Sequence, residues 1–201
     1  MVNYRRNKLE TSDAVYFITM VTKGRRHLFI PDVTSDIIRE TMFFMSADLD
    51  FDFLAWVILP DHIHWLIKPG NNDYSDIVFS YKRRITAEFR REGFITPNTT
   101  IWQDRFWERT VRNENEMSNY IEYIHYNPIK HGWVDCVANW RYSSYHDYVL
   151  DGIYPDDLRG EANATIQEME FYGQSEDPES RPPVSNDKTR STGGRDSGST
   201  H

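Results

Sequence analysis

The chain has 201 residues, 39% of them hydrophobic and 14% aromatic, and its formal net charge is −8. A chain of this length and composition can bury one ordinary hydrophobic core. The single cysteine, Cys136, excludes an intramolecular disulfide, and the apolar runs are too short to span a membrane. The first residues lack the apolar segment of a signal peptide, so we expect a cytoplasmic protein.

Charge and composition divide the chain into three parts. Residues 1–150 have a formal charge of −2 and residues 151–201 one of −6. From residue 174 onward there is one valine and no isoleucine, leucine, phenylalanine, tyrosine or tryptophan, too little apolar surface to offset the entropy lost on folding. We therefore predict a folded domain over residues 1–150, a transition segment over 151–173 and a disordered acidic tail over 174–201.

Seven elements are expected in the folded part. Periodicity, turn residues and helix caps predict strand, helix, strand, strand, helix, strand and helix, at residues 14–22, 33–47, 52–59, 62–68, 73–91, within 100–111, and 114–126. Asn127-Pro128 is expected to stop the last helix. The first six elements form a ferredoxin-like βαββαβ pattern, an α+β fold with an antiparallel sheet and helices on one face. The last, C-terminal helix is left to lie near the other face or the edge.

Two histidines interrupt the apolar run LPDHIHWLI, residues 59–67. Because side chains alternate along a strand, His62 and His64 leave the same face about 6.6 Å apart, while Ile63 and Trp65 leave the other. Two imidazoles on one face can bind a divalent cation. Two histidines on a solvated sheet face need no function, however, and the local sequence does not decide between these interpretations.

The last predicted helix carries the motif YIEYIHYNP. Tyr123 and Asn127 are four residues apart and therefore lie one above the other on a face beside the buried stripe, while His125 points away from them. A phenol and an amide oxygen suit a nucleophile and a hard metal ligand. A half-buried aromatic residue and a C-terminal cap before Pro128 explain the same residues without any function.

Four segments together resemble the REP-associated tyrosine transposases, a branch of the single-tyrosine HUH transposase family. They are PDHIHWLI, the helix with KRR, WQDRFWERTVRNENEMSNYIEYIHYNPIKHGWV and NWRYSSYHDY, and the resemblance covers residues 4–148. The combination is far more specific than His-x-His alone. Departures are small: Leu59 stands where the family often has Met, and Ile129 and Trp133 stand where it often has Val and Leu.

The resemblance implies an HUH fold in which the final helix is catalytic. His62 and His64 would be the metal-binding pair, and Asn127 would complete a site for Mg²⁺ or Mn²⁺. Tyr123 would be the nucleophile, and its attack on DNA would give a 5′-phosphotyrosyl link and release a 3′-OH. Because one phosphodiester is exchanged for another, no nucleotide cofactor is expected.

The implied substrate is single-stranded DNA beside the hairpin of a palindromic repeat, and the expected state is a monomer, although related transposases can dimerise. The candidates for phosphate contacts are Lys82, Arg83, Arg84, Arg105 and Arg109. The alternative is that these basic residues are ordinary solvated surface residues. The candidates for stacking on unpaired bases are Trp102, Phe106 and Trp107. Core packing is the expected role of at least two of these aromatic residues. Lys130 and His131 face either DNA or solvent.

Two other functions fit the same residues. A hydrolase would keep the histidine pair but use water as the nucleophile, so cleavage would leave no covalent adduct and would survive Tyr123→Phe. A catalytically silent hairpin-binding protein would still bind DNA after both His62 and His64 were replaced by alanine. The sequence alone does not separate these functions from the transposase.

Overall fold

The computed structural model describes residues 14–30, 32–70, 73–159 and 169. The predicted acidic tail, and most of the predicted transition segment beyond residue 159, lie outside the described residues. Within the described part, no helix combines the length and the apolar character that crossing a membrane requires.

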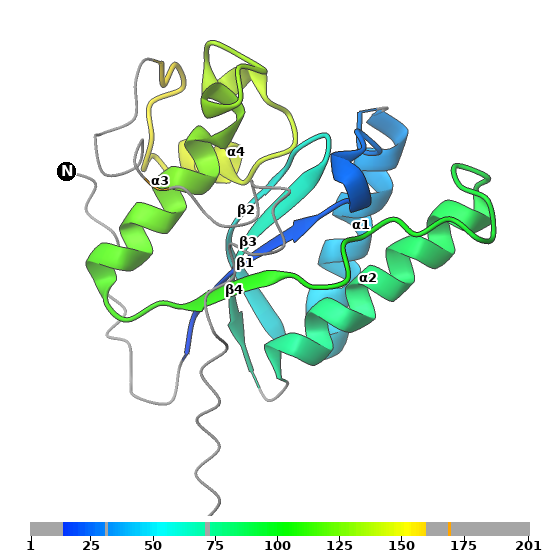
Figure 1. Cartoon of the computed structure of the whole chain (residues 1–201). Helices are drawn as coiled ribbons and strands as arrows, with labels where there is room; N and C mark the ends of the chain where they lie inside the picture. The colour runs from blue at the N-terminus through cyan, green and yellow to red at the C-terminus, as the bar shows by residue number, and fades with distance from the viewer. Residues whose placement is uncertain (1–13, 31, 71–72, 160–168, 170–201) are drawn as a thin grey trace, which may run out of the picture.

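A four-stranded antiparallel sheet forms the centre of the molecule (Figure 1). The strands are β1 Tyr16–Val21, β2 Phe51–Ile58, β3 His62–Pro69 and β4 Trp107–Thr110. Their order across the sheet is β2-β3-β1-β4, and every neighbouring pair is antiparallel. The predicted hairpin of β2 and β3 is present, and the predicted α+β, ferredoxin-like fold is confirmed.

Helices cover both faces of this sheet. The helices are α1 Asp32–Leu49, α2 Tyr74–Arg91, α3 Glu114–Lys130 and α4 Tyr145–Leu150, with short 3₁₀ turns η1 Lys23–Arg25 and η2 Val137–Asn139. In Figure 1, α1 and α2 lie on one side of the sheet, and α3 and α4 lie on the other. The final long helix therefore takes the face that the βαββαβ unit leaves open.

Side-chain alternation gives each face its own core, because successive residues of a strand point to opposite sides. The core under α1 and α2 contains Ile18, Met20, Ile58, Ile63, Trp65, Ile77, Tyr81 and Ile85. The core under α3 contains Phe17, Val57, Leu66, Tyr120, Ile121, Tyr123 and Ile124. Both layers are therefore held by burial of large apolar side chains, the dominant stabilising effect in folding.

Helix α3 begins as predicted but ends later than predicted. The Asn113 side chain accepts a hydrogen bond from the Glu116 amide at 2.9 Å, which caps the first turn. The predicted stop after residue 126 is wrong, because the helix continues through Pro128 to Lys130. Proline in a helix interior costs about 3 kcal/mol, and burial of Asn127 and Pro128 offsets this cost. Packing of the whole fold here outweighs the local preference.

The segment between α3 and α4 returns to the edge strand β2. The Ile58 amide donates to the Tyr142 carbonyl at 2.9 Å, and the Ser144 amide donates to the Trp56 carbonyl at 3.0 Å. The Ser144 hydroxyl also lies 2.8 Å from Nε2 of His125 on α3. These bonds cover part of the β2 edge and fix α3 against the sheet.

Candidate active site

Strand β3 places the histidine pair on the sheet face that α3 covers. His62 and His64 lie opposite Val21 and Thr19 of β1, and both histidines are 2% exposed. Ile63, between them, is buried in the core under α1 and α2. The alternation is as predicted, and burial of both histidines excludes the alternative of a solvated sheet face.

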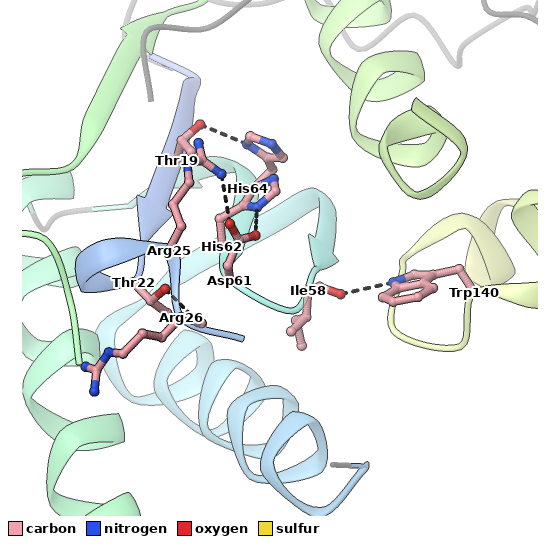
Figure 2. A network of polar contacts seen from close by, with 9 residues as sticks. All are labelled: Thr19, Thr22, Arg25, Arg26, Ile58, Asp61, His62, His64 and Trp140. Carbon is pink, nitrogen blue, oxygen red and sulfur yellow. Dashed lines mark hydrogen bonds and ion pairs between the residues drawn. The ribbon is translucent and has the colours of Figure 1, made fainter. Parts of the chain in front are cut away.

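Hydrogen bonds hold both imidazoles through Nδ1 (Figure 2). His62 Nδ1 lies 2.5 Å from one carboxylate oxygen of Asp61, and Arg25 donates to the other oxygen at 2.8 Å. His64 Nδ1 lies 2.8 Å from the Thr19 hydroxyl. Both Nε2 atoms are buried and have no hydrogen-bond partner among the described residues. Proteins orient histidine ligands in this way, with one ring nitrogen anchored and the other left for the metal.

Asp61 carries the negative charge of this network. Burial raises the pKa of its carboxyl, but the hydrogen bonds and charges of His62 and Arg25 outweigh burial and lower the pKa to about 2. Burial, reinforced by the charge of His62, holds the pKa of His64 well below its usual range. At neutral pH His64 is therefore an uncharged imidazole, the form that binds metal.

Helix α3 brings Tyr123 to the histidine pair, and Asn127 lies on the same helix between Tyr123, which contacts His64, and His131, which contacts His62. The Tyr123 ring lies edge-on to the His64 ring, with centroids 5.3 Å apart. The side-chain oxygen of Asn127 is buried and has no hydrogen-bond partner in the described part of the chain, while its nitrogen lies 3.5 Å from the Tyr123 carbonyl. Residues named from two separate sequence motifs therefore meet in one place.

The donor atoms left over at this place suit a divalent cation. Two imidazole nitrogens and one amide oxygen are buried without hydrogen-bond partners among the residues described, and such atoms are costly unless something binds them. Within the described ranges, no three His, Cys, Asp or Glu side chains form a group that could hold a metal ion. A cation at His62 and His64 would therefore depend on the Asn127 oxygen and on ligands from substrate or water.

The continuation of α3 through Pro128 adds Lys130 to the site. Its ammonium nitrogen lies 5.0 Å from the centre of the Tyr123 ring and donates a hydrogen bond to the Met169 carbonyl at 2.7 Å. Tyr123 itself is 0% exposed. The groups that cover its ring therefore have to move before a DNA strand can reach the hydroxyl.

His131, which the sequence predicts to face either DNA or solvent, is a neighbour of the site. Its ring lies edge-on to the His62 ring, with centroids 5.1 Å apart. Burial, together with the charge of His62, lowers the pKa of His131 to about 4, so the ring is neutral at pH 7. The four-residue spacing of Asn127 and His131 would place both on one helix face. The predicted helix end before Pro128 excluded His131 from that face.

Trp102 does not have the role predicted for it. It is 4% exposed, and its indole nitrogen donates to the Lys82 carbonyl at 3.1 Å, so neither ring face is available to a base. Lys82 is also half-buried: its ammonium donates to the Gln103 carbonyl at 2.7 Å, and burial lowers its pKa. Phe106 and Trp107 are partly buried against the two cores. The alternative of core packing is correct for Trp102.

The predicted phosphate contacts lie in two different layers. Arg83 and Arg84 are exposed on α2, on the far side of the sheet from the histidine pair. The Arg84 guanidinium lies 4.4 Å from the centre of the Phe44 ring of α1, and the Arg83 guanidinium lies 5.7 Å from that of Phe79. Neither side chain contributes to the surface around Tyr123.

Arg105 and Arg109 lie before and within β4, respectively. Arg109 is opposite Phe17 in the pairing of β1 with β4, so it points to the α3 face, where it forms an ion pair with Glu116 at 3.2 Å. Arg105 is exposed in the segment that leads into β4. The sheet face that carries the histidines therefore has a basic residue, Arg109, at its β4 edge.

Comparison with known proteins places this geometry in context. Residues 10–127 match the family model described as "Transposase IS200 like". The REP-associated tyrosine transposase of Escherichia coli K12 is 33% identical over 163 residues, which are 80% of this chain and 93% of its own length. A Haemophilus influenzae protein assigned to the same group is 35% identical over 176 residues, 83% of this chain and 98% of its own. A solved structure of a REP-associated tyrosine transposase bound to a REP hairpin aligns with a TM-score of 0.60 and 32% identity, covering 80% of this chain and 93% of that one.

Proposed function

This chain belongs to the REP-associated tyrosine transposases of the IS200-like family, and we propose that it cleaves and rejoins single-stranded DNA with Tyr123 as the nucleophile. The observation that carries the proposal is the position of the Tyr123 ring, 5.3 Å from the ring of His64. Packing alone does not require two buried imidazole nitrogens beside it that lack hydrogen-bond partners among the described residues.

The residues that would hold a metal are His62, His64 and Asn127. Mg²⁺ or Mn²⁺ bound there would polarise the phosphate and neutralise the charge that develops on it. Nδ1 of His62 lies 2.5 Å from the Asp61 carboxylate, and Nδ1 of His64 lies 2.8 Å from the Thr19 hydroxyl. With the proton on Nδ1, each ring would present the lone pair of Nε2 to the metal.

Tyr123 would attack the phosphorus of one phosphodiester. A bond forms between the phenol oxygen and phosphorus, the bond from phosphorus to the 3′ oxygen breaks, and the phenol proton ends on the released 3′-OH. A phenol with a reference pKa of about 10 is mostly protonated at neutral pH, and the Lys130 ammonium beside the ring stabilises its developing negative charge. Attack of a 3′-OH on the phosphotyrosine is the same exchange in reverse and rejoins the DNA.

The proposed substrate is single-stranded DNA next to a hairpin of a palindromic repeat. The solved relative is bound to a REP hairpin, and we extend this class of ligand to the present chain. Basic residues near the histidine end of the sheet give a local positive surface despite the net charge of −8: Lys23, Arg25, Arg26 and Lys130. Arg109, opposite Phe17, adds a cation further along the same face, and Arg105 precedes β4.

The experiment that tests this proposal is transfer of a labelled strand to the protein. A hairpin oligonucleotide with single-stranded flanks, labelled on the 3′ side of the cleavage position, is incubated with Mn²⁺ and the full-length protein, and denaturing gels are run. We expect a labelled protein band, its loss with Tyr123→Phe, and its persistence with Tyr126→Phe, a matched change three residues along the same helix. Cleavage without a labelled band would favour the hydrolase, and binding without cleavage would favour the silent binding protein.

A further inference from the structure

Trp133, three residues beyond α3, is an exposed tryptophan close to the proposed active site. All six tryptophans lie within the described residues, and Trp133, at 39%, is the one in the exposed class. The His27 ring lies edge-on to it with centroids 5.4 Å apart, and Trp140 lies 6.3 Å away. The Trp140 indole nitrogen donates to the Ile58 carbonyl at 3.0 Å, which fixes that ring at the end of β2 (Figure 2).

One loop connects this aromatic group to the histidine pair. Residues 22–28 follow β1, and within them Arg25 donates to Asp61, which holds His62, while His27 contacts Trp133. A second connection comes from α3, because His131 contacts His62 and lies two residues before Trp133. Trp133 and His27 therefore lie at the same end of the sheet as the histidine pair.

The backbone of this loop is held in an uncommon conformation. Gly24 and Arg25 have positive φ angles of 67° and 49°, and for arginine this left-handed region is disfavoured. The ion pair between Arg25 and Asp61, at 2.8 Å, supports the conformation. Strained residues that the surrounding structure holds in place occur preferentially at functional sites.

The charges around the aromatic pair suit a nucleic acid strand. Lys23 and Arg26 are exposed in the same loop, and Lys130 is at the end of α3. Cations attract the phosphates of a DNA strand without regard to sequence, whereas aromatic rings bind its unpaired bases by stacking. The cationic loop and the exposed indole of Trp133 beside it together provide the two kinds of contact that proteins use to bind single strands.

We propose that Trp133, supported by His27, is a stacking subsite for one unpaired nucleobase next to the phosphate that Tyr123 attacks. This subsite rests on the proposed function, since it positions the same strand. The indole is 39% exposed, and the contact with the His27 ring restricts its movement. Stacking of one base would orient the strand for attack while reading little of its sequence, because every base has an aromatic face.

The test measures binding of hairpin DNA in a Tyr123→Phe background, so that chemistry does not interfere. Fluorescence anisotropy gives the affinity of full-length protein for oligonucleotides in which single flanking nucleotides are made abasic one at a time. We expect Trp133→Ala to weaken binding by between about 5-fold and about 100-fold, and Trp133→Phe to restore most of the loss. One abasic position should weaken binding similarly, and that position should have no further effect in Trp133→Ala, as coupled groups require.

The matched control is Phe79→Ala, which removes an exposed aromatic ring on α2 on the far side of the sheet. It should leave DNA affinity unchanged. Weakening by Trp133→Ala that is equal at every abasic position, or no weakening at all, would contradict the subsite. If the protein with Tyr123 intact forms no adduct while the coupling between Trp133 and one base is present, the proposed chemistry is overturned and the subsite is kept. The two failures are therefore distinguishable.

Discussion

The two faces of β3 are built according to opposite rules. Toward α1 and α2 the strand presents Ile63, Trp65 and Ile67, which are fully buried among other apolar side chains, and only the Trp65 indole nitrogen adds a polar atom. Toward α3 it presents His62 and His64, which are equally buried but leave two ring nitrogens without hydrogen-bond partners among the described residues. The first face stabilises the fold. On the second face, each unsatisfied histidine nitrogen lowers stability by about 1–3 kcal/mol but keeps a donor atom available for a ligand.

The largest effect is expected on the apolar face. Trp65→Ala removes the indole from a closed core, and the free energy of unfolding should fall by about 3–5 kcal/mol, measured by urea denaturation. Adduct formation per folded molecule should stay close to the unsubstituted level, because Trp65 points away from Tyr123. A loss of less than about 1 kcal/mol would mean that this face is not the main source of stability.

The opposite result is expected on the histidine face. His64→Ala removes a proposed metal ligand, and the rate of adduct formation should fall by more than about 100-fold, the upper end of what loss of an outer-shell partner produces. The free energy of unfolding should fall less than for Trp65→Ala, because the imidazole is smaller than the indole and its loss removes less buried apolar surface. Normal adduct formation in this variant would remove His64 from the active site.

A smaller effect on metal binding is expected at Asp61, which contacts a proposed ligand and does not itself bind the metal. Asp61→Asn keeps the size of the side chain but removes the charge that orients His62, and Mn²⁺ affinity should fall by about 10–100-fold. Calorimetric titration of the protein with Mn²⁺ measures this change in affinity. Asp76→Asn, at an acidic residue on the far layer at the start of α2, serves as the matched control and should leave the affinity unaltered.

The smallest effect is expected on DNA affinity, when one arginine is removed from either side of the sheet. Arg109→Ala should weaken hairpin binding a few-fold and reduce the slope of log affinity against log salt by about 1, as expected for loss of one phosphate contact. Arg84→Ala, on the α2 side, should change neither quantity. Equal effects of the two substitutions would place the DNA across both layers of the molecule.

Much of this arrangement could be predicted because it depends on local periodicity. The alternation of His62 and His64 with Ile63 is a property of any strand, and the order of strands and helices follows from the apolar pattern and the turn residues. The four-residue spacing of Tyr123 and Asn127 likewise puts both on one helix face. The resemblance to a family then assigned chemistry to residues that periodicity had only grouped.

What could not be predicted depends on packing between distant segments. A proline ends most helices, but packing of α3 against the sheet lets the helix continue past Pro128, and this brings His131 to His62. The burial of Trp102 and the exposure of Trp133 are likewise set by which elements cover them, and no local pattern distinguishes the two tryptophans. The position of Arg25 beside Asp61 depends on a loop conformation that only the folded chain defines.

Locating the atom to which the DNA becomes attached tests whether Tyr123 is the nucleophile. The protein is reacted with hairpin DNA and Mn²⁺, digested with a protease and a nuclease, and the peptide that retains a nucleotide is sequenced by mass spectrometry. The structure predicts a phosphotyrosyl nucleotide on Tyr123 and on no other residue. Attachment to Tyr120 or Tyr126, or complete cleavage of the DNA with no modified peptide, would contradict a site composed of the β3 histidines and the α3 tyrosine.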